Sequence, residues 1–122
     1  AEGEPQSPIG EAVARAAAEG YRAVAGKRKP YHGYYYRMLY AQGANADGGA
    51  MEYFQDGELT GGIALLAWPA HYEASGVMSF MINQEGVVYQ KDLGEDTGAA
   101  AESIQVFDPD DSWSVVDAGD DS

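Results

Sequence analysis

The chain has 122 residues with 20 acidic and 7 basic side chains, which give a formal net charge of −13. This charge argues against binding to a nucleic-acid backbone or an anionic membrane surface, because both need Lys and Arg, and it favours a basic protein partner or divalent cations. The absence of cysteine excludes disulfides, thiolate metal sites and cysteine nucleophiles, and no apolar run approaches the roughly 20 residues that span a bilayer.

The first part of the chain predicts one helix. Ser7 and Pro8 offer an N-cap followed by proline at the first helical position, and the alanines that follow favour a helix. We expect this helix over residues 8–19, because Gly20 suits the position just past a helix end. The basic run at residues 27–29 is expected to be a solvated loop.

Residues 30–40 give the strongest strand signal. Five of the nine tyrosines lie in this segment, and aromatic residues are typical of strands. If the strand runs through the whole segment, its alternation puts two sets of side chains on opposite faces. The first set is His32, Tyr34, Tyr36, Met38 and Tyr40, and the second is Tyr31, Gly33, Tyr35, Arg37 and Leu39. Because both sets contain aromatics, we expect both faces to be covered.

The remainder of the chain predicts further strands and a second helix. The expected strands are 51–55, 63–68, 77–82, 87–91 and 113–116. Asp56-Gly57 is typical of a tight hairpin turn, and Pro69 is expected to end the third of the chain's strands. A helix is expected over 97–106, with Asp96 or Thr97 as its cap.

This order of elements predicts the fold class. Strands follow one another without strand–helix–strand alternation, which is typical of an α+β fold with an antiparallel sheet. We expect four to six strands, with two flanking helices that cover one face of the sheet. The 45% hydrophobic residues are sufficient for one α+β domain over residues 1–116, followed by a frayed acidic tail at 117–122.

Several blocks are distinctive beyond their secondary structure. They include Pro30–Arg37, Ala67–Ala70, Ser75–Met78, Asn83–Gly94 and Phe107–Asp110. These blocks resemble the bacterial family catalogued as Domain of Unknown Function 2950, and the resemblance covers about residues 1–116. It implies a secreted protein of the bacterial envelope, periplasmic or extracellular. It also implies a longer protein, whose absent N-terminal half is an expected partner of this sheet.

A second resemblance concerns the run Ala67–Val88. It is similar to the C-terminal sheet of type IV pilin-like and pseudopilin proteins, in which a long helix packs on an antiparallel sheet. This resemblance implies a pilin-like architecture, with the long helix contributed by the absent segment.

The residues that could carry chemistry are few. Histidine is the side-chain type suited to proton transfer near neutrality, so His32 and His71 could form an acid/base site with Tyr31, Tyr35, Glu73 or Asp92, although histidines hydrogen-bonded beside the sheet are the simpler interpretation. Neither a Gly-x-Ser-x-Gly elbow nor a His-Glu-x-x-His pair nor a phosphate loop occurs. No catalytic residue and no cofactor is predicted.

Asp108, Asp110 and Asp111 are the best metal candidates. Closely spaced carboxylates in a turn can bind a hard cation such as Ca²⁺. The spacing of an EF-hand is absent, however, so an Asp-Pro turn that stops the second helix is the alternative.

Together with the envelope location that the family resemblance implies, the sequence favours a non-catalytic extracytoplasmic domain that acts through protein–protein interaction, as an accessory subunit of an envelope assembly. Aromatic residues dominate interface energetics, so they are the candidate contacts. The candidates are Tyr31, Tyr34, Tyr35, Tyr36, Trp68 and Tyr72. Three alternatives stay open: a pilin-like filament subunit, a hydrolase-type enzyme using His32 and His71, and a tyrosine platform for sugars. Nucleic acid and direct membrane insertion are not expected.

Overall fold

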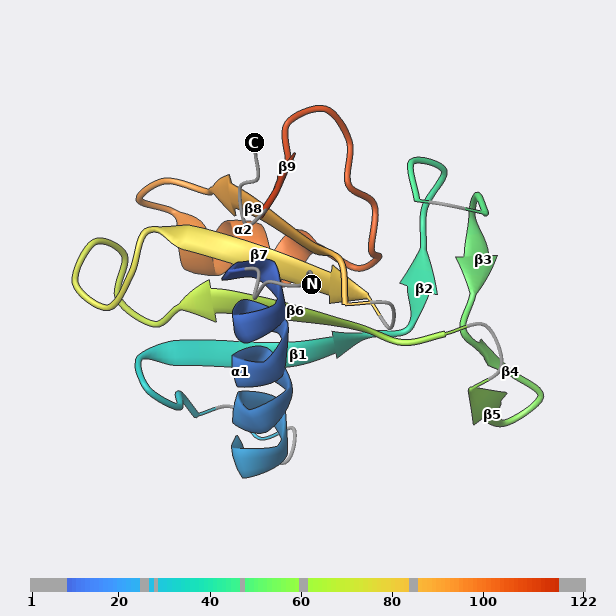
Figure 1. Cartoon of the computed structure of the whole chain (residues 1–122), viewed down its shortest axis with the longest axis horizontal. Helices are drawn as coiled ribbons and strands as arrows, with labels where there is room; N and C mark the ends of the chain where they lie inside the picture. The colour runs from blue at the N-terminus through green and yellow to red at the C-terminus, as the bar shows by residue number, and fades with distance from the viewer. Residues whose placement is uncertain are drawn as a thin grey trace, which may run out of the picture.

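The computed structural model describes residues 9–24, 27, 29–46, 48–59, 62–83 and 86–116. Its main sheet is antiparallel and has five strands in the order β1-β6-β7-β8-β9 (Figure 1). These strands are β1 (Tyr34–Leu39), β6 (Ala64–Pro69), β7 (Met78–Asn83), β8 (Val88–Asp92) and β9 (Ser114–Val115). The expected α+β fold with an antiparallel sheet is confirmed.

Four short strands form a separate part of the molecule, which projects beyond the end of β1 in Figure 1. We call it the arm. It consists of the pair β2 (Ala41–Gln42) and β3 (Met51–Glu52) and the pair β4 (Phe54–Gln55) and β5 (Glu58–Leu59). The single strand expected at 51–55 is divided because Tyr53 turns inward and is fully buried, with its hydroxyl donating to Gln42 Oε1 at 2.8 Å.

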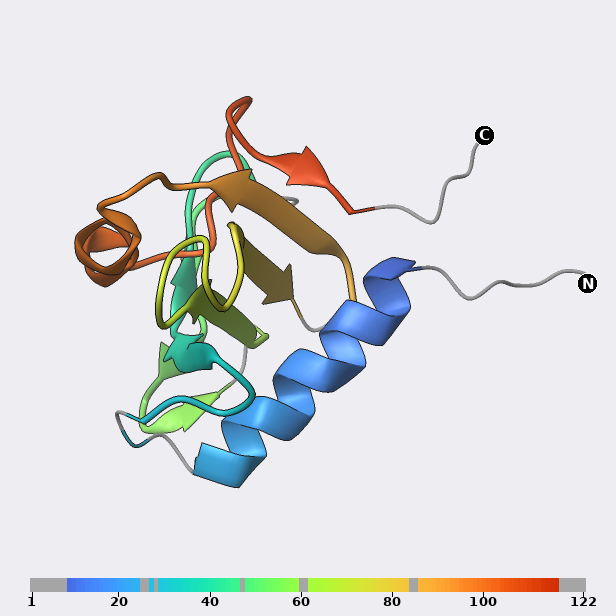
Figure 2. The ribbon, with the colours of Figure 1, turned by 90° about the vertical axis from the view of Figure 1, so that its left-hand side faces the viewer.

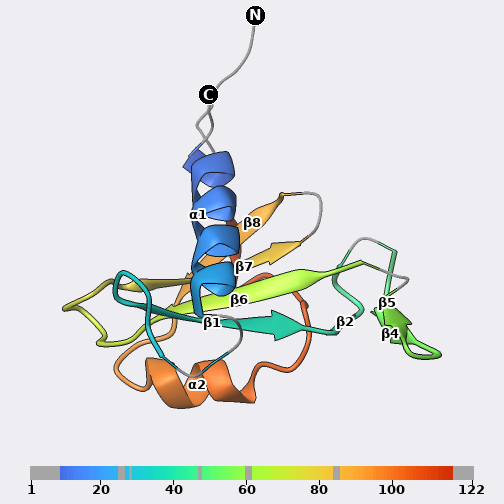
Figure 3. The ribbon, with the colours of Figure 1, turned by 90° about the horizontal axis from the view of Figure 1, so that it is seen from below.

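The two helices cover opposite faces of the main sheet. Figures 2 and 3 show α1 (Ile9–Val24) on one side and α2 (Thr97–Ser103) on the other. The expectation that both helices cover one face is therefore wrong. The physical reason is that the strands are apolar on both faces: Leu66 packs in the core on the α2 side, whereas its neighbour Leu65 packs in the cluster under α1.

Strand β1 begins later than expected. His32 and Gly33 have positive φ angles of 52° and 86°, and Tyr31 and Tyr34 exchange both backbone hydrogen bonds, at 2.8 and 3.1 Å. These values describe a two-residue hairpin turn, so the period-2 pattern holds only from Tyr34 onward. A similar turn at Asp56-Gly57, with φ angles of 54° and 82°, joins β4 to β5 as expected.

Helix α1 runs past its expected end. Gly20 lies within it rather than just beyond it, and a Cβ atom at Gly20 would lie 2.4 Å from Cζ of Tyr36. The glycine is therefore needed for the close approach of the Tyr36 ring and not for a helix cap. The expected cap at Ser7 and Pro8 and the acidic tail at 117–122 lie outside the described residues.

Helix α2 is shorter than expected, because it ends at Ser103. Asp96 stands at its N-cap position but makes no side-chain capping bond, and the Thr97 hydroxyl donates to the Gly94 carbonyl. The other end is held by Arg37 of β1, whose guanidinium donates to the carbonyls of Ala101 at 2.9 Å and Ile104 at 2.5 Å. A cation at a helix C-terminus can bond to the last carbonyls and interacts favourably with the helix dipole.

The contact between Gly20 and Tyr36 gives a prediction for stability. Ala is about 1 kcal/mol more favourable than Gly inside a helix, but here its methyl group would displace the Tyr36 ring. We expect Gly20→Ala to lower the free energy of unfolding by about 1 kcal/mol in the natural chain. In a Tyr36→Ala background the same change should raise it by about 1 kcal/mol. Urea denaturation of the four variants measures the reversal, and the same sign in both backgrounds would contradict the contact.

Candidate functional site

The outer edge of β1 is the starting point for the site. Within the described part of the chain, β6 is the only strand that pairs with β1, and the register sets Tyr34 opposite Pro69. In an antiparallel ladder the residues alternate between those that bond to the neighbouring strand and those that point away from it. Because Tyr34 exchanges its bonds with Tyr31, the backbone groups of Tyr36 and Met38 also point away from β6.

Both ends of this outer edge are closed. At one end the turn at residues 31–34 uses the backbone groups of Tyr34. At the other end Tyr53 of the arm donates its N–H to the Tyr40 carbonyl at 2.8 Å. Between these closures, no described residue donates to or accepts from the backbone of Tyr36 and Met38 on the outer side. The edge therefore leaves two residues, Tyr36 and Met38, each with one backbone N–H and one C=O that can bond to another strand.

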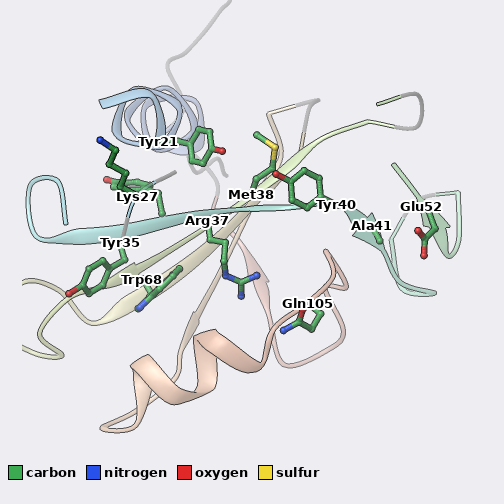
Figure 4. Close-up of a pocket in the computed structure, with 11 residues that line it drawn as sticks. Tyr21, Lys27, Tyr35, Arg37, Met38, Tyr40, Ala41, Glu52, Trp68 and Gln105 are labelled. Carbon is green, nitrogen blue, oxygen red and sulfur yellow. The ribbon is translucent and has the colours of Figure 1, made fainter. Parts of the chain in front are cut away.

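A groove of about 600 Å³ follows this edge, and we call it the β1 groove. Figure 4 shows β1 between the two helices, with Tyr21 of α1 on one side and Arg37 directed toward α2 on the other. The residues that border the groove include Tyr21, Lys27, Tyr35, Met38, Tyr40, Glu52, Trp68 and Gln105. Aromatic side chains thus flank the free backbone groups on both faces of the sheet.

The charged groups of the β1 groove are unevenly placed. Lys27 follows the C-terminal end of α1, whereas Glu52 belongs to the arm, and both are exposed. The third charged group is Arg37, whose guanidinium is bonded to the carbonyls at the end of α2. Burial raises the pKa of Tyr36 above its usual value, so its hydroxyl stays neutral at physiological pH.

Three of the six predicted contact residues border the groove. Tyr35 and Trp68 lie on its α2 side, with ring centroids 5.7 Å apart, and Tyr36 lies on the other face against Gly20. Trp68 is only 4% exposed and belongs to the core on the α2 side. Its ring packs against Tyr35 and the core, so little of its surface is open to a partner.

The other three lie elsewhere. The Tyr34 hydroxyl donates to the Met78 carbonyl at 3.2 Å, so this side chain reaches across the sheet to the start of β7. Tyr31 stands edge-on to His32, with centroids 4.3 Å apart, in the turn before β1. The Tyr72 hydroxyl donates to Asp92 Oδ1 at 2.7 Å. The six aromatics do not form one continuous surface.

The two histidines lie in loops that meet at one end of the sheet. The Ala70 N–H donates to the Gly33 carbonyl at 2.8 Å, which brings the segments of His71 and His32 side by side. Both imidazoles are exposed, and no described carboxylate accepts a hydrogen bond from either ring. Among the described residues, Ser75 Oγ bonds only to the backbone N–H and carbonyl of His71. The hydrolase hypothesis therefore gains no support from this geometry.

The aspartates proposed for a metal are used in turns. Asp108 Oδ1 accepts from the backbone N–H of Asn45 at 2.9 Å and from its side-chain Nδ2 at 3.0 Å. Asp110 Oδ1 accepts from the Ser112 hydroxyl, which is the largest cause that lowers the pKa of Asp110, and from the backbone N–H of Ser112 at 2.9 Å, which lowers it further. Asp111 is exposed. In the part of the chain that the structure describes, no group of three or more His, Asp or Glu residues is placed to hold a metal.

The sequence did not point to Tyr21, Lys27, Tyr40, Glu52 or Gln105 as site residues. They come from four separate parts of the chain and meet only because β1 is the edge strand. Local patterns predict strands but not their order in the sheet. The period-2 alternation of residues 34–39 was the one available signal, since it placed Tyr36 and Met38 together.

The open edge gives a prediction for hydrogen exchange. The N–H groups of Tyr35, Arg37 and Leu39 point toward β6, so they should exchange slowly. Those of Tyr36 and Met38 should exchange on the order of 100-fold faster. Two-dimensional NMR of the protein in deuterated water measures all five. Slow exchange at Tyr36 or Met38 would mean that these groups are already paired.

Tyr72 gives a prediction for ionisation. Its hydrogen bond to Asp92 is the largest cause that raises its pKa from 10.0 to about 12. A raised pKa in the folded state contributes stability below pH 10.0, and this contribution is lost as the pH rises through about 12. In an NMR titration, Asp92→Asn should lower the pKa of Tyr72 toward 10.0, and Glu73→Gln, which removes a smaller cause, should change it less. An unchanged pKa in Asp92→Asn would contradict the hydrogen bond.

Comparisons with known proteins bear on the family. No helix among the described residues is both long and apolar enough to cross a membrane. No curated protein and no solved structure matches the chain, so the pilin-like resemblance is not shown. The model of the family described as "Protein of unknown function (DUF2950)" matches residues 1–116. This chain therefore belongs to the DUF2950 family.

Proposed function

We propose that this protein binds an extended segment of another protein, which adds as a strand to the outer edge of β1. The single observation that supports the proposal is the pair of outward-pointing residues, Tyr36 and Met38, at the base of a groove bordered by aromatic side chains. An extended polypeptide is the ligand whose N–H and C=O groups repeat with the same spacing as those of a strand.

The proposal defines how much the backbone can contribute. Two outward residues offer up to four hydrogen bonds, over a length of about 7 Å between Tyr36 and Met38. So short a ladder gives modest affinity, and the side chains of the bound segment must supply the rest. In a strand these side chains alternate between faces. One set would therefore lie against Tyr35 on the α2 side, and the other against Tyr21 on the α1 side.

The proposed setting is a non-catalytic one in the bacterial envelope. The resemblance to secreted proteins supports a periplasmic or extracellular location, and there the protein would act as an accessory subunit of an envelope assembly. The binding mode above requires no chemical step. Neither His32 nor His71 borders the β1 groove, so the groove is a binding surface in this proposal.

The test is selection of peptides of about 12 residues, displayed on phage, against the folded protein, followed by affinity measurements on the synthetic peptides. Met38→Pro removes one outward N–H, and proline is tolerated on an edge strand where its nitrogen faces outward. We expect Met38→Pro to weaken binding by at least about 10-fold, which is about 1.4 kcal/mol. Met38→Ala keeps the N–H and should weaken binding by less than about threefold.

Two further measurements complete this test. Tyr35→Ala should weaken binding by more than about 1 kcal/mol, because it removes an aromatic side of the groove. Thermal unfolding monitored by circular dichroism establishes that each variant is folded. Equal affinities of the natural protein and a folded Met38→Pro variant would contradict addition of a strand at β1.

A further inference from the structure

The α2 side of the β1 groove contains an arginine whose charge has no carboxylate partner. Figure 4 shows Arg37 on this side of β1, together with Trp68 and Gln105, which also border the groove. Arg37 is half-buried, and no carboxylate among the described residues bonds to its guanidinium. A charge that loses part of its hydration is normally paired, and this chain has 20 acidic side chains that could have supplied the partner.

The guanidinium of Arg37 is held in place, but only some of its donors are used. Both of its bonds to α2, to the carbonyls of Ala101 and Ile104, come from Nη2. In the described part of the chain, the only buried side-chain atom without a hydrogen-bond partner is Ser79 Oγ, so Nη1 and Nε of Arg37 are open to solvent in the groove. A guanidinium fixed in this way can donate to a carboxylate with little further loss of side-chain freedom.

A strand that adds to the outer edge of β1 places one of its side chains beside Arg37. The backbone groups of Tyr36 and Met38 point outward, and Arg37 lies between them with its side chain directed to α2. In an antiparallel pair, the residue that faces Arg37 lies between two hydrogen-bonded pairs, where opposite Cα atoms are about 4.5 Å apart. Directly opposite residues have their side chains on the same face. The side chain at this position therefore lies on the α2 side, next to Arg37.

The β1 groove also differs in charge from the chain as a whole. Its charged residues are two cations, Lys27 and Arg37, and one anion, Glu52, whereas the chain carries a net charge of −13. A carboxylate placed at Arg37 is therefore attracted over a short distance. A partner that is acidic over its whole length is repelled by the chain.

We infer that the bound segment carries a glutamate or aspartate whose carboxylate accepts a hydrogen bond from Arg37. The inference rests on the proposed function and specifies its partner: an extended segment with one acidic residue among neutral or basic ones. The acidic residue lies between the two residues that pair with Tyr36 and Met38. A side-chain carboxylate fits better than a terminal one, because the segment must continue past Arg37 to reach both outward residues. The net charge of −13 opposes a second copy of this chain as the occupant.

The experiment is parallel selection of the same displayed peptide library against the natural protein and the Arg37→Gln variant. Peptides selected on the natural protein should share an Asp or Glu at one position relative to their apolar residues, and those selected on Arg37→Gln should not. The selected sequence is then synthesised with an amidated C-terminus, in its acidic form and with the corresponding amide side chain. On the natural protein the amide form should bind about 10-fold more weakly. On Arg37→Gln the two forms should bind within about twofold of each other.

Lys29→Gln is the matched control. It removes the same charge from an exposed side chain that does not border the groove. It should therefore keep the preference for the acidic peptide and change its affinity by less than about twofold at moderate salt. An equal loss of preference in Arg37→Gln and Lys29→Gln would overturn the inference, because it would indicate attraction by net charge alone.

The peptide side of the experiment does not depend on the stability of a variant. Circular dichroism shows whether Arg37→Gln keeps its fold without the two bonds to α2. If it does not, the two peptide forms are compared on the natural protein alone, and equal affinities there overturn the inference. Binding that requires a free C-terminal carboxylate would also overturn it, because the acidic group would then not be a side chain.

Other outcomes separate this inference from the proposed function. If Met38→Pro weakens binding while the selected peptides share no acidic residue, the strand site stands and the carboxylate site is overturned. If Met38→Pro has no effect on a folded protein, the proposed function itself fails. Sedimentation of the protein without peptide gives the last result: a dimer that Met38→Pro dissociates would identify a second copy as the occupant and overturn the separate partner.

Discussion

The rest of the structure depends on burial of both faces of a single sheet. The strands carry apolar side chains on both faces, so neither face is stable in contact with water, and each face is covered by one helix. Two consecutive residues of β1 attach these helices: Tyr36 packs on Gly20 of α1, and Arg37 holds the end of α2 through two carbonyls. The edge strand is thereby fixed between two helices that stand on either side of it.

This arrangement explains why the candidate site lies at an edge and not in a closed cavity. The helices cover the two faces of the sheet, with β1 between them (Figure 3), and the groove follows the outer edge of this strand. Because adjacent side chains of β1 point to different helices, the groove has two sides of different composition. A ligand of two-sided character, such as an extended polypeptide, fits such a groove better than a compact molecule.

Local patterns predicted the elements but not their assembly. The alternation in residues 34–39 and the Asp56-Gly57 turn were recognisable because they depend on near neighbours in the chain. The tyrosine strand is shorter than predicted because His32 and Gly33 form a turn with positive φ angles. The sequence did not reveal this turn, since a His-Gly pair is a weaker turn signal than Asn-Gly. The role of Gly20 was misread because its contact with Tyr36 is made across the sheet face. The sequence did not predict how deeply Trp68 is buried, because its burial depends on residues of α2, far away in the chain.

The two closures at the ends of β1 have a consequence for how the protein behaves in concentrated solution. An open strand edge normally invites unlimited addition of like strands, which leads to fibrils. Here the turn at residues 31–34 and the hydrogen bond from Tyr53 to Tyr40 limit the unpaired edge of β1 to two outward-pointing residues. The molecule can thus keep unpaired backbone groups at this edge without becoming a template for aggregation.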